Sequence, residues 1–233
     1  MRLDPPLAEG RLLARYKRFF ADIALPGGDI VTAHCPNTGA MMGLDRPGAR
    51  AWISTSDNPK RKLRHTLEAL EADGVVVGIN TGRPNRLAEE AIRGGRIAEF
   101  ADVAAIRREV RYGANSRVDL VLEHGAGASP TYVEIKNVHL SRSAGLAEFP
   151  DCATARGVKH LGELAAMAAA GTRAAMLYIV QRPDAARFAI AADLDPGYAA
   201  AVAAARAAGV EMLAYACRVS PEEIAVSHPL EMT

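Results

Sequence analysis

Along the first third of the chain, apolar and polar positions alternate in short runs that turn residues separate. This pattern is typical of strands, whose successive side chains point to opposite faces. It predicts strands over 15–25, 30–35, 51–54 and 75–81, with a hairpin turn at 26–29 (Pro-Gly-Gly-Asp). Short strands spaced in this way predict a small β-barrel or sandwich.

The pattern changes near residue 82, after which apolar residues recur at helical spacing between strand-like runs. Leu87, Ala91 and Ile92 mark one face of a helix over 85–93, which Gly94 and Gly95 end. Three strands, a helix, a strand, a helix and a strand follow, over 104–112, 117–122, 132–140, 154–170, 174–181, 196–208 and 211–219. We therefore expect an α/β (α+β) chain with domains at 1–82 and 83–233.

Charged side chains interrupt two of the expected strands. In the second of them, alternation puts Glu134 and Lys136 on one face. A hairpin symmetric about the bond between Ala126 and Gly127 places Asp119, on the preceding strand, directly opposite Glu134. Two carboxylates and a lysine then converge within a sheet, where buried carboxylates need a compensating cation.

This cluster has the composition of a magnesium site. Carboxylate oxygens of Asp119 and Glu134, with the Ile135 carbonyl and water, suit Mg²⁺ or Mn²⁺. Lys136 beside them is placed to orient or deprotonate a water molecule for attack on a phosphodiester. The spacing Asp-x14-Glu-x-Lys is short, and a plain ion pair on two exposed strands is the alternative.

Longer motifs carry a resemblance to known families. The spacing of Asp119, Glu134 and Lys136, together with the order of helix, three strands, helix and strand, resembles the PD-(D/E)xK nuclease superfamily. Nearly end to end, the chain also resembles the sugar fermentation stimulation protein A family. The motifs are residues 15–19 (Arg-Tyr-Lys-Arg-Phe), 34–41 (His-Cys-Pro-Asn-Thr-Gly-Ala-Met), 54–58 (Ser-Thr-Ser-Asp-Asn), 80–81, 85–87, 149–151 (Phe-Pro-Asp) and residues within 154–161.

The resemblance implies an OB-fold-like barrel joined to a restriction-endonuclease-like mixed sheet flanked by helices. It also implies a DNA-binding protein with a regulatory link to sugar metabolism. Carried over by position, Asp119 and Glu134 are metal ligands, Lys136 is the catalytic lysine, and Glu90 is an additional acid from the preceding helix. A surface position is the alternative for Glu90, and Val118 stands where the superfamily motif has its proline.

Charge is divided unevenly between the expected domains. The chain has 28 basic and 27 acidic residues, a net charge of +1, which excludes a polycation. Residues 1–66, however, hold 11 basic and 6 acidic residues. We expect DNA phosphate contacts from Arg15, Lys17, Arg18, Lys60, Arg61, Lys62 and Arg64, and from Arg156, Lys159 and His160, which share one helix face.

The alternative for each of these basic groups is that it is an ordinary solvent-exposed surface without a role in DNA binding. Tyr16, Phe19 and Phe20 lie among the first set, where aromatic rings either stack on bases or belong to the core, and we expect Phe19 or Phe20 to belong to the core. The cysteines Cys35, Cys152 and Cys217 are expected as buried, reduced thiols, because they show no metal-binding spacing.

Two functions remain open from the sequence. One is a Mg²⁺-dependent nuclease acting on DNA, with RNA as a further possible substrate. The other is a non-catalytic, sequence-nonspecific DNA-binding regulatory protein that keeps the nuclease fold as a scaffold. The chain shows neither a membrane-length apolar run nor a signal-peptide pattern, so we expect a cytoplasmic protein without a membrane partner. The sequence leaves its oligomeric state undetermined.

Overall fold

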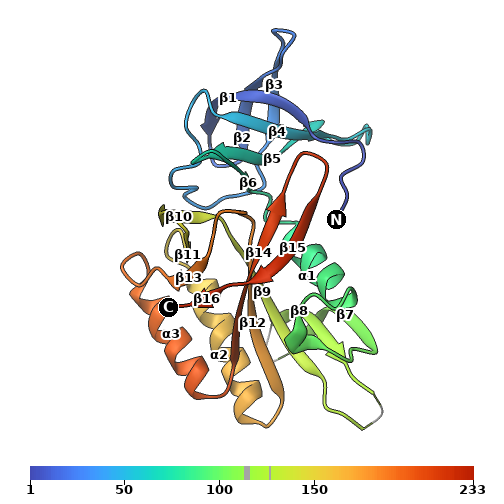
Figure 1. The fold of residues 1–233 in the computed structure, drawn as a ribbon, viewed down its shortest axis with the longest axis vertical. Helices are drawn as coiled ribbons and strands as arrows, with labels where there is room; N and C mark the ends of the chain where they lie inside the picture. The colour runs from blue at the N-terminus through green and yellow to red at the C-terminus, as the bar shows by residue number, and fades with distance from the viewer. Residues whose placement is uncertain (113–115, 126) are drawn as a thin grey trace.

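The computed structural model describes residues 1–112, 116–125 and 127–233 and shows a β-barrel beside an α/β part (Figure 1). The barrel strands are β1 (Ala8–Tyr16), β2 (Phe20–Ala24), β3 (Ile30–His34), β4 (Arg50–Thr55) and β5 (His65–Ala72), and β6 (Val75–Gly78) pairs with β5. A parallel pairing of β3 with β5 closes the ring in the order β1-β2-β3-β5-β4. The predicted OB-fold-like barrel is thereby confirmed.

The barrel encloses an apolar core of its own. Leu12, Ile23, Ile53 and Leu67 are fully buried there, one from each of four strands. Burying a side chain of this size contributes about 1.5–3 kcal/mol. Gly10 allows β1 to approach β2, because a Cβ at this position would lie 2.5 Å from Cγ2 of Ile23.

The first hairpin differs from the prediction. The run 15–25, expected as one strand, contains the turn between β1 and β2, where Lys17 (φ 49°) and Arg18 (φ 63°) adopt the left-handed conformation. Lysine and arginine seldom do so, and the sequence therefore carries no turn signal there. Strand β5 is also absent from the prediction, because the Glu and Ala that make up much of it are poor strand formers.

The α/β part is built on a mixed sheet. Its elements are α1 (Pro84–Arg93), η1 (Ala98–Phe100), β7 (Ala105–Tyr112), β8 (Ser116–Glu123), β9 (Thr131–Val138), α2 (Ala155–Ala169), β12 (Arg173–Val180), α3 (Pro196–Ala207), β14 (Glu211–Val219) and β15 (Ile224–Pro229). The sheet order is β15-β14-β12-β9-β8-β7, with β9, β12 and β14 parallel. The predicted order of helix, three strands, helix, strand, helix and strand is confirmed.

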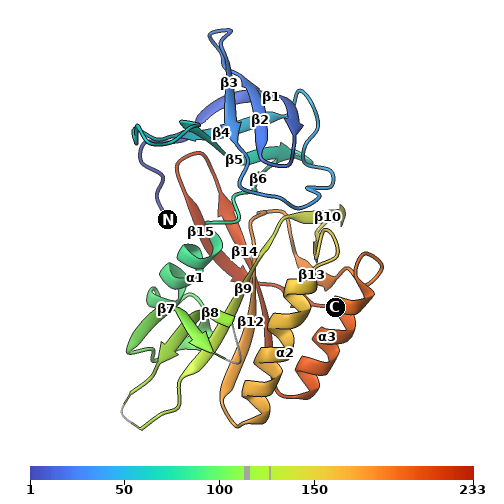
Figure 2. The same ribbon diagram turned by 180° about the vertical axis from the view of Figure 1, so that it is seen from behind.

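Helices cover both faces of this sheet (Figure 2). On one face, Leu87 and Ile92 of α1 share a core with Ile135 of β9. On the other, Leu161 of α2 and Tyr198 of α3 share a core with residues of β12 and β14. The sheet is therefore buried on both sides, as parallel strands require.

A small second sheet is absent from the prediction. It joins β10 (Leu140–Ser143), β11 (Leu146–Phe149), β13 (Arg187–Ile190) and β16 (Glu231–Met232). Strands of two to four residues are too short to show an alternating pattern, so they cannot be predicted from the sequence. Within the described ranges, no helix combines the length and apolar character needed to cross a membrane.

The register of the β8–β9 hairpin agrees with the prediction. Leu120 lies opposite Val133, and Leu122 opposite Thr131, which is the register of a hairpin symmetric about the predicted midpoint. Ala126, at that midpoint, lies outside the described residues.

Direct contacts join the barrel to the α/β part. The Gly78 amide donates to the carbonyl of Gln181 at 2.8 Å, and a Cβ at Gly78 would lie only 2.6 Å from Oε1 of Gln181. The Thr81 hydroxyl, in the segment between β6 and α1, donates to the Pro36 carbonyl at 2.7 Å. The loop that follows β3 is thereby tied to the segment that leads into the α/β part.

Candidate metal centre at the domain junction

A cavity of about 430 Å³ lies where the barrel meets the α/β part. The barrel contributes the loop after β3, and the α/β part contributes the start of α1, β8, β9, the segment before α2 and the first turns of α2. Asp119, Glu134, Ile135 and Lys136 all line it. We refer to Asp119, Glu134 and Lys136 as the carboxylate cluster.

Asp119 is held by both of its carboxylate oxygens. The Asn85 side chain donates to Oδ1 at 2.9 Å, and the Ile135 amide donates to Oδ2 at 2.7 Å. Burial and the nearby charge of Glu134 raise the pKa of Asp119, although these hydrogen bonds and Lys136 oppose the shift. The ionised form of Asp119 is thus disfavoured, which is the situation that a bound cation relieves.

Glu134 is almost fully buried and has one unsatisfied oxygen. Its Oε1 accepts from Lys136 Nζ at 2.8 Å and also contacts Nδ1 of His160. Its Oε2 is buried and has no hydrogen-bond partner within the described part of the chain. Burial acts to raise the pKa of Glu134, but His160 and Lys136 lower it overall, so this carboxylate is ionised at neutral pH. An ionised buried oxygen without a partner calls for a ligand.

The carboxylate cluster fits a hard divalent cation that keeps most of its water. Two carboxylates in a polar cavity are the set that Mg²⁺ or Mn²⁺ accepts, and the unsatisfied Oε2 of Glu134 is a ready ligand. Within the described ranges, no three His, Cys, Asp or Glu side chains form a metal-binding group. Any ion held here would therefore depend on Asp119 and Glu134, supplemented by neutral oxygens such as the Ile135 carbonyl.

Glu90 does not belong to this cluster, which corrects the expectation for it. Its Oε1 accepts from the α-amino group of Met1 at 2.7 Å, its side chain is half exposed, and it does not line the cavity. The neighbouring Glu89 pairs with Arg93 and Arg108. The turn of α1 that reaches the cluster is the first one, so α1 contributes Asn85 and no acid.

The predicted cations on α2 divide into two groups. Arg156 and His160 line the cavity, and Nε of Arg156 donates to Nε2 of His160 at 3.3 Å. Lys159 does not line it and lies 3.8 Å from Glu163 on the surface. The helical spacing thus places two of the three residues at the cavity.

The basic residues of the barrel lie outside the cavity lining. Arg15 has a buried side chain that donates to the carbonyls of Asn37 (3.1 Å) and Gly39 (2.8 Å), so it supports the loop after β3. The others are exposed: Lys17 and Arg18 in the β1–β2 turn, Lys60 and Lys62 in the segment before β5, with Arg61 bonded to Thr66 and Arg64 3.6 Å from Asp57.

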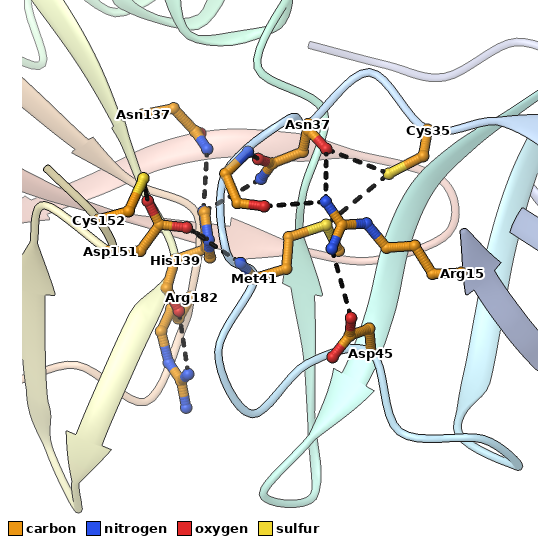
Figure 3. A network of polar contacts seen from close by, with 11 residues as sticks. Arg15, Cys35, Asn37, Met41, Asp45, Asn137, His139, Asp151, Cys152 and Arg182 are labelled. Carbon is orange, nitrogen blue, oxygen red and sulfur yellow. Dashed lines mark hydrogen bonds and ion pairs between the residues drawn. The ribbon is translucent and has the colours of Figure 1, made fainter. Parts of the chain in front are cut away.

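A second polar cluster in the cavity wall is missing from the prediction (Figure 3). Nε2 of His139 lies 3.3 Å from Oδ2 of Asp151, and Nδ1 of His139 lies 3.5 Å from the Asn37 amide nitrogen. The Met41 amide donates to the same oxygen of Asp151 at 3.0 Å. We call Asn37, His139 and Asp151 the junction cluster, because it ties the barrel loop to the α/β part.

The acid of the junction cluster is well stabilised, although Nε2 of His139, 3.3 Å from that acid, is buried without a hydrogen-bond partner among the described residues. Burial acts to raise the pKa of Asp151, but His139, the Met41 amide and Cys152 lower it to about 2. Gly39 lies against this carboxylate, since a Cβ there would be 2.5 Å from Oδ2 of Asp151. Cys152 is exposed, which corrects the expectation of three buried thiols.

The barrel, the mixed sheet and the cavity between them define a class: an OB-fold barrel fused to a restriction-endonuclease-like α/β domain. The family model described as "SfsA N-terminal OB domain" matches residues 13–79, and the one described as "Sugar fermentation stimulation protein RE domain" matches residues 82–223. The chain belongs to the sugar fermentation stimulation protein family.

Relatives match over the full length. A "Sugar fermentation stimulation protein homolog" of Agrobacterium fabrum is 56% identical over 100% of this chain and 97% of its own. That of Rhodospirillum centenum is 53% identical over 100% of both chains. A solved structure, "The structure of Pyrococcus Furiosus SfsA in complex with Ca2+", superposes with a TM-score of 0.90 at 29% identity, covering 100% of this chain and 98% of the other.

Proposed function

We propose that this protein binds DNA and hydrolyses its phosphodiester bonds with a divalent metal ion, Mg²⁺ or Mn²⁺, held by Asp119 and Glu134. The observation that carries the proposal is the buried, ionised Glu134, whose Oε2 lacks a partner within the described residues, beside Asp119 and Lys136 in one cavity. The solved Pyrococcus furiosus relative is a complex with Ca²⁺, which supports a divalent-cation site in this family.

The chain's own residues have separable roles in this proposal. Asn85 and the Ile135 amide orient Asp119, and Lys136 and His160 hold Glu134 in its ionised form. Lys136 is the group placed to move a proton at Nζ, because it lies at the cavity beside Glu134 and is only slightly exposed. A bound divalent ion would supply Lewis acidity and charge neutralisation for the phosphate. Arg156 is placed to contact a phosphate oxygen.

A second candidate is the non-catalytic DNA-binding protein. Lys136 already neutralises Glu134 through the 2.8 Å ion pair, an arrangement that is also stable as a structural feature. In this case, DNA binding would depend on the exposed cations of the barrel, survive removal of metal and weaken steeply with salt.

Incubation with single-stranded, nicked, flapped and duplex DNA and with RNA, in Mg²⁺ or Mn²⁺, separates the candidates. We expect cleavage of at least one substrate by the wild type, none in EDTA, and loss of cleavage in Lys136→Ala. Calorimetric titration with Mg²⁺ should show binding that Asp119→Asn abolishes. Absence of cleavage on every substrate would leave the binding protein as the function, and equal cleavage by Lys136→Ala would contradict the proposed hydrolysis through the carboxylate cluster.

A further inference from the structure

The β1–β2 turn presents aromatic rings to solvent. Tyr16 is 39% exposed and Phe19 is 48% exposed, both high values for aromatic side chains. The Tyr16 ring stacks on Phe20 with its centroid 5.5 Å away and an interplanar angle of 16°. Its hydroxyl donates to Oδ1 of Asp22 at 3.2 Å, and Asp22 is also bound by Thr32. The Tyr16 ring is therefore held in one orientation while part of it stays open.

The two residues between these rings are exposed cations. Lys17 and Arg18 have no hydrogen bond or ion pair from their side chains in the part of the chain that the structure describes, unlike Arg15 and Arg50. Their positive φ values keep the turn tight, so the two cations lie directly beside the rings. We call Tyr16, Lys17, Arg18 and Phe19 the aromatic turn. Rings and unpaired cations together match the base and phosphate chemistry of a nucleic-acid strand.

The aromatic turn adjoins the cavity on its barrel side. The Phe19 carbonyl accepts from the Cys35 amide at 2.7 Å, immediately before the loop that forms the cavity wall. The aromatic turn is therefore joined directly to the start of the barrel loop whose residues Asn37, Thr38 and Gly39 line the cavity.

The cavity, of about 430 Å³, has room for a nucleotide-sized group. A single strand presents its bases already unstacked, whereas a duplex must first lose pairing and stacking before a base can leave it. A paired duplex also has its base faces covered by neighbouring bases, which makes them inaccessible to Tyr16 and Phe19.

We propose that the aromatic turn binds single-stranded DNA by stacking on its bases and directs that strand into the cavity. The inference deepens the proposed function and rests on it for the identity of the ligand. In this proposal the barrel selects single-stranded over paired DNA, whereas the carboxylate cluster carries out hydrolysis.

Fluorescence anisotropy of the full chain in EDTA tests this with three labelled probes of equal length: an oligo-dT strand, an abasic deoxyribose-phosphate strand and a duplex. We expect the wild type to bind oligo-dT more tightly than the duplex. The double variant Tyr16→Ala/Phe19→Ala should bind oligo-dT about 10-fold or more weakly, since stacking on an aromatic side chain is worth that much per base. Its affinity for the abasic strand should be unchanged, because that strand has no bases to stack.

Two further variants sharpen the test. Ile30→Ala removes another exposed apolar side chain of the barrel, 65% exposed, and should bind all probes like the wild type. Lys17→Ala/Arg18→Ala should weaken binding to oligo-dT and abasic strands alike and reduce the slope of log affinity against log salt by about 1.4.

Equal losses for oligo-dT and abasic strands in Tyr16→Ala/Phe19→Ala, or tighter wild-type binding to the duplex than to oligo-dT, would overturn the inference. The measurement contains no metal and no cleavage step. Its outcome is therefore independent of whether the hydrolysis experiment succeeds.

Discussion

The two acidic clusters of the cavity wall differ in how well the protein stabilises their carboxylates. In the junction cluster, Asp151 accepts from the Met41 amide and faces His139, and its pKa is lowered to about 2. In the carboxylate cluster, Asp119 has a raised pKa and Glu134 has an oxygen without a partner in the described part of the chain. His139 Nε2 is also buried without a hydrogen-bond partner in the described part of the chain, so the contrast concerns the carboxylates alone. Asp151 is stabilised by the protein itself, whereas Asp119 and Glu134 are a pair that a cation would stabilise further.

The largest expected effect concerns the carboxylate cluster. Lys136→Ala should lower the rate of DNA cleavage by about 10²–10⁴-fold, the usual contribution of a positioned proton-transfer group. Lys159→Ala, also a lysine but exposed on α2 and outside the cavity, should cleave like the wild type. A gel-based cleavage assay measures both. Similar rates in the two variants would remove the functional distinction between the clusters.

A matched pair of substitutions tests the comparison through stability. Asp151→Asn should lower the free energy of unfolding by about 2 kcal/mol at pH 7, because the lowered pKa of Asp151 measures its stabilising contacts. Asp119→Asn should leave it unchanged or raise it in EDTA, since burial and Glu134 disfavour the Asp119 charge. Urea denaturation measures the free energy of unfolding of both variants. A larger loss of stability in Asp119→Asn than in Asp151→Asn would contradict the assignment of the two clusters.

The same contrast has a pH signature. A carboxyl with a lowered folded-state pKa stabilises the protein above its ordinary pKa, near 3.8, and this stabilisation is lost as pH falls toward about 2. The stability difference between wild type and Asp151→Asn should therefore be about 2 kcal/mol at pH 5 and shrink between about pH 4 and pH 2. For Asp119→Asn the trend should have the opposite sign, because the Asp119 pKa is raised. Urea midpoints across this range would show a pH-independent difference if Asp151 were unpaired.

The smallest expected effect tests the packing of the junction cluster. Gly39→Ala places a Cβ 2.5 Å from Oδ2 of Asp151 and should destabilise the protein by about 1 kcal/mol. Gly27→Ala has no atom within 4 Å and serves as the control in thermal denaturation. In an Asp151→Ala background the effect of Gly39→Ala should shrink, because the carboxylate is gone and only Oδ1 of Asn37, 3.1 Å from the added Cβ, remains close. Additive effects would place the strain elsewhere.

Prediction from sequence succeeds here where the information is local. Strand alternation and a symmetric hairpin are enough to set the β8–β9 register, which brings Asp119 to the Ile135 amide beside Glu134. Which side chain of α1 reaches the cavity depends on how the helix is rotated about its axis when it packs. The prediction of Glu90 is wrong for this reason, because Glu90 faces the α-amino group of Met1. A role transferred from a family by sequence position is not precise enough to tell one turn of a helix from the next.

The junction cluster was beyond reach for a different reason. Asn37 and His139 are 102 residues apart, and Met41 and Asp151 are 110 apart. These contacts form only when the barrel packs against the α/β part. The hydrophobic periodicity of a sequence predicts helices and strands but does not predict how two domains pack together. Asn37 and Asp151 do lie in the motifs that carry the family resemblance. A motif, however, does not show which residues contact one another.

The support that Arg15 gives to the loop has a consequence for the cavity wall. Its guanidinium binds the main-chain carbonyls of Asn37 and Gly39, so this hold is independent of which side chains the loop carries. Asn37 and Gly39 are constrained by the junction cluster, whereas Thr38 between them is exposed and lines the cavity. The main chain on either side of Thr38 is therefore fixed from behind, so a substitution at Thr38 should alter the wall of the cavity without displacing the loop.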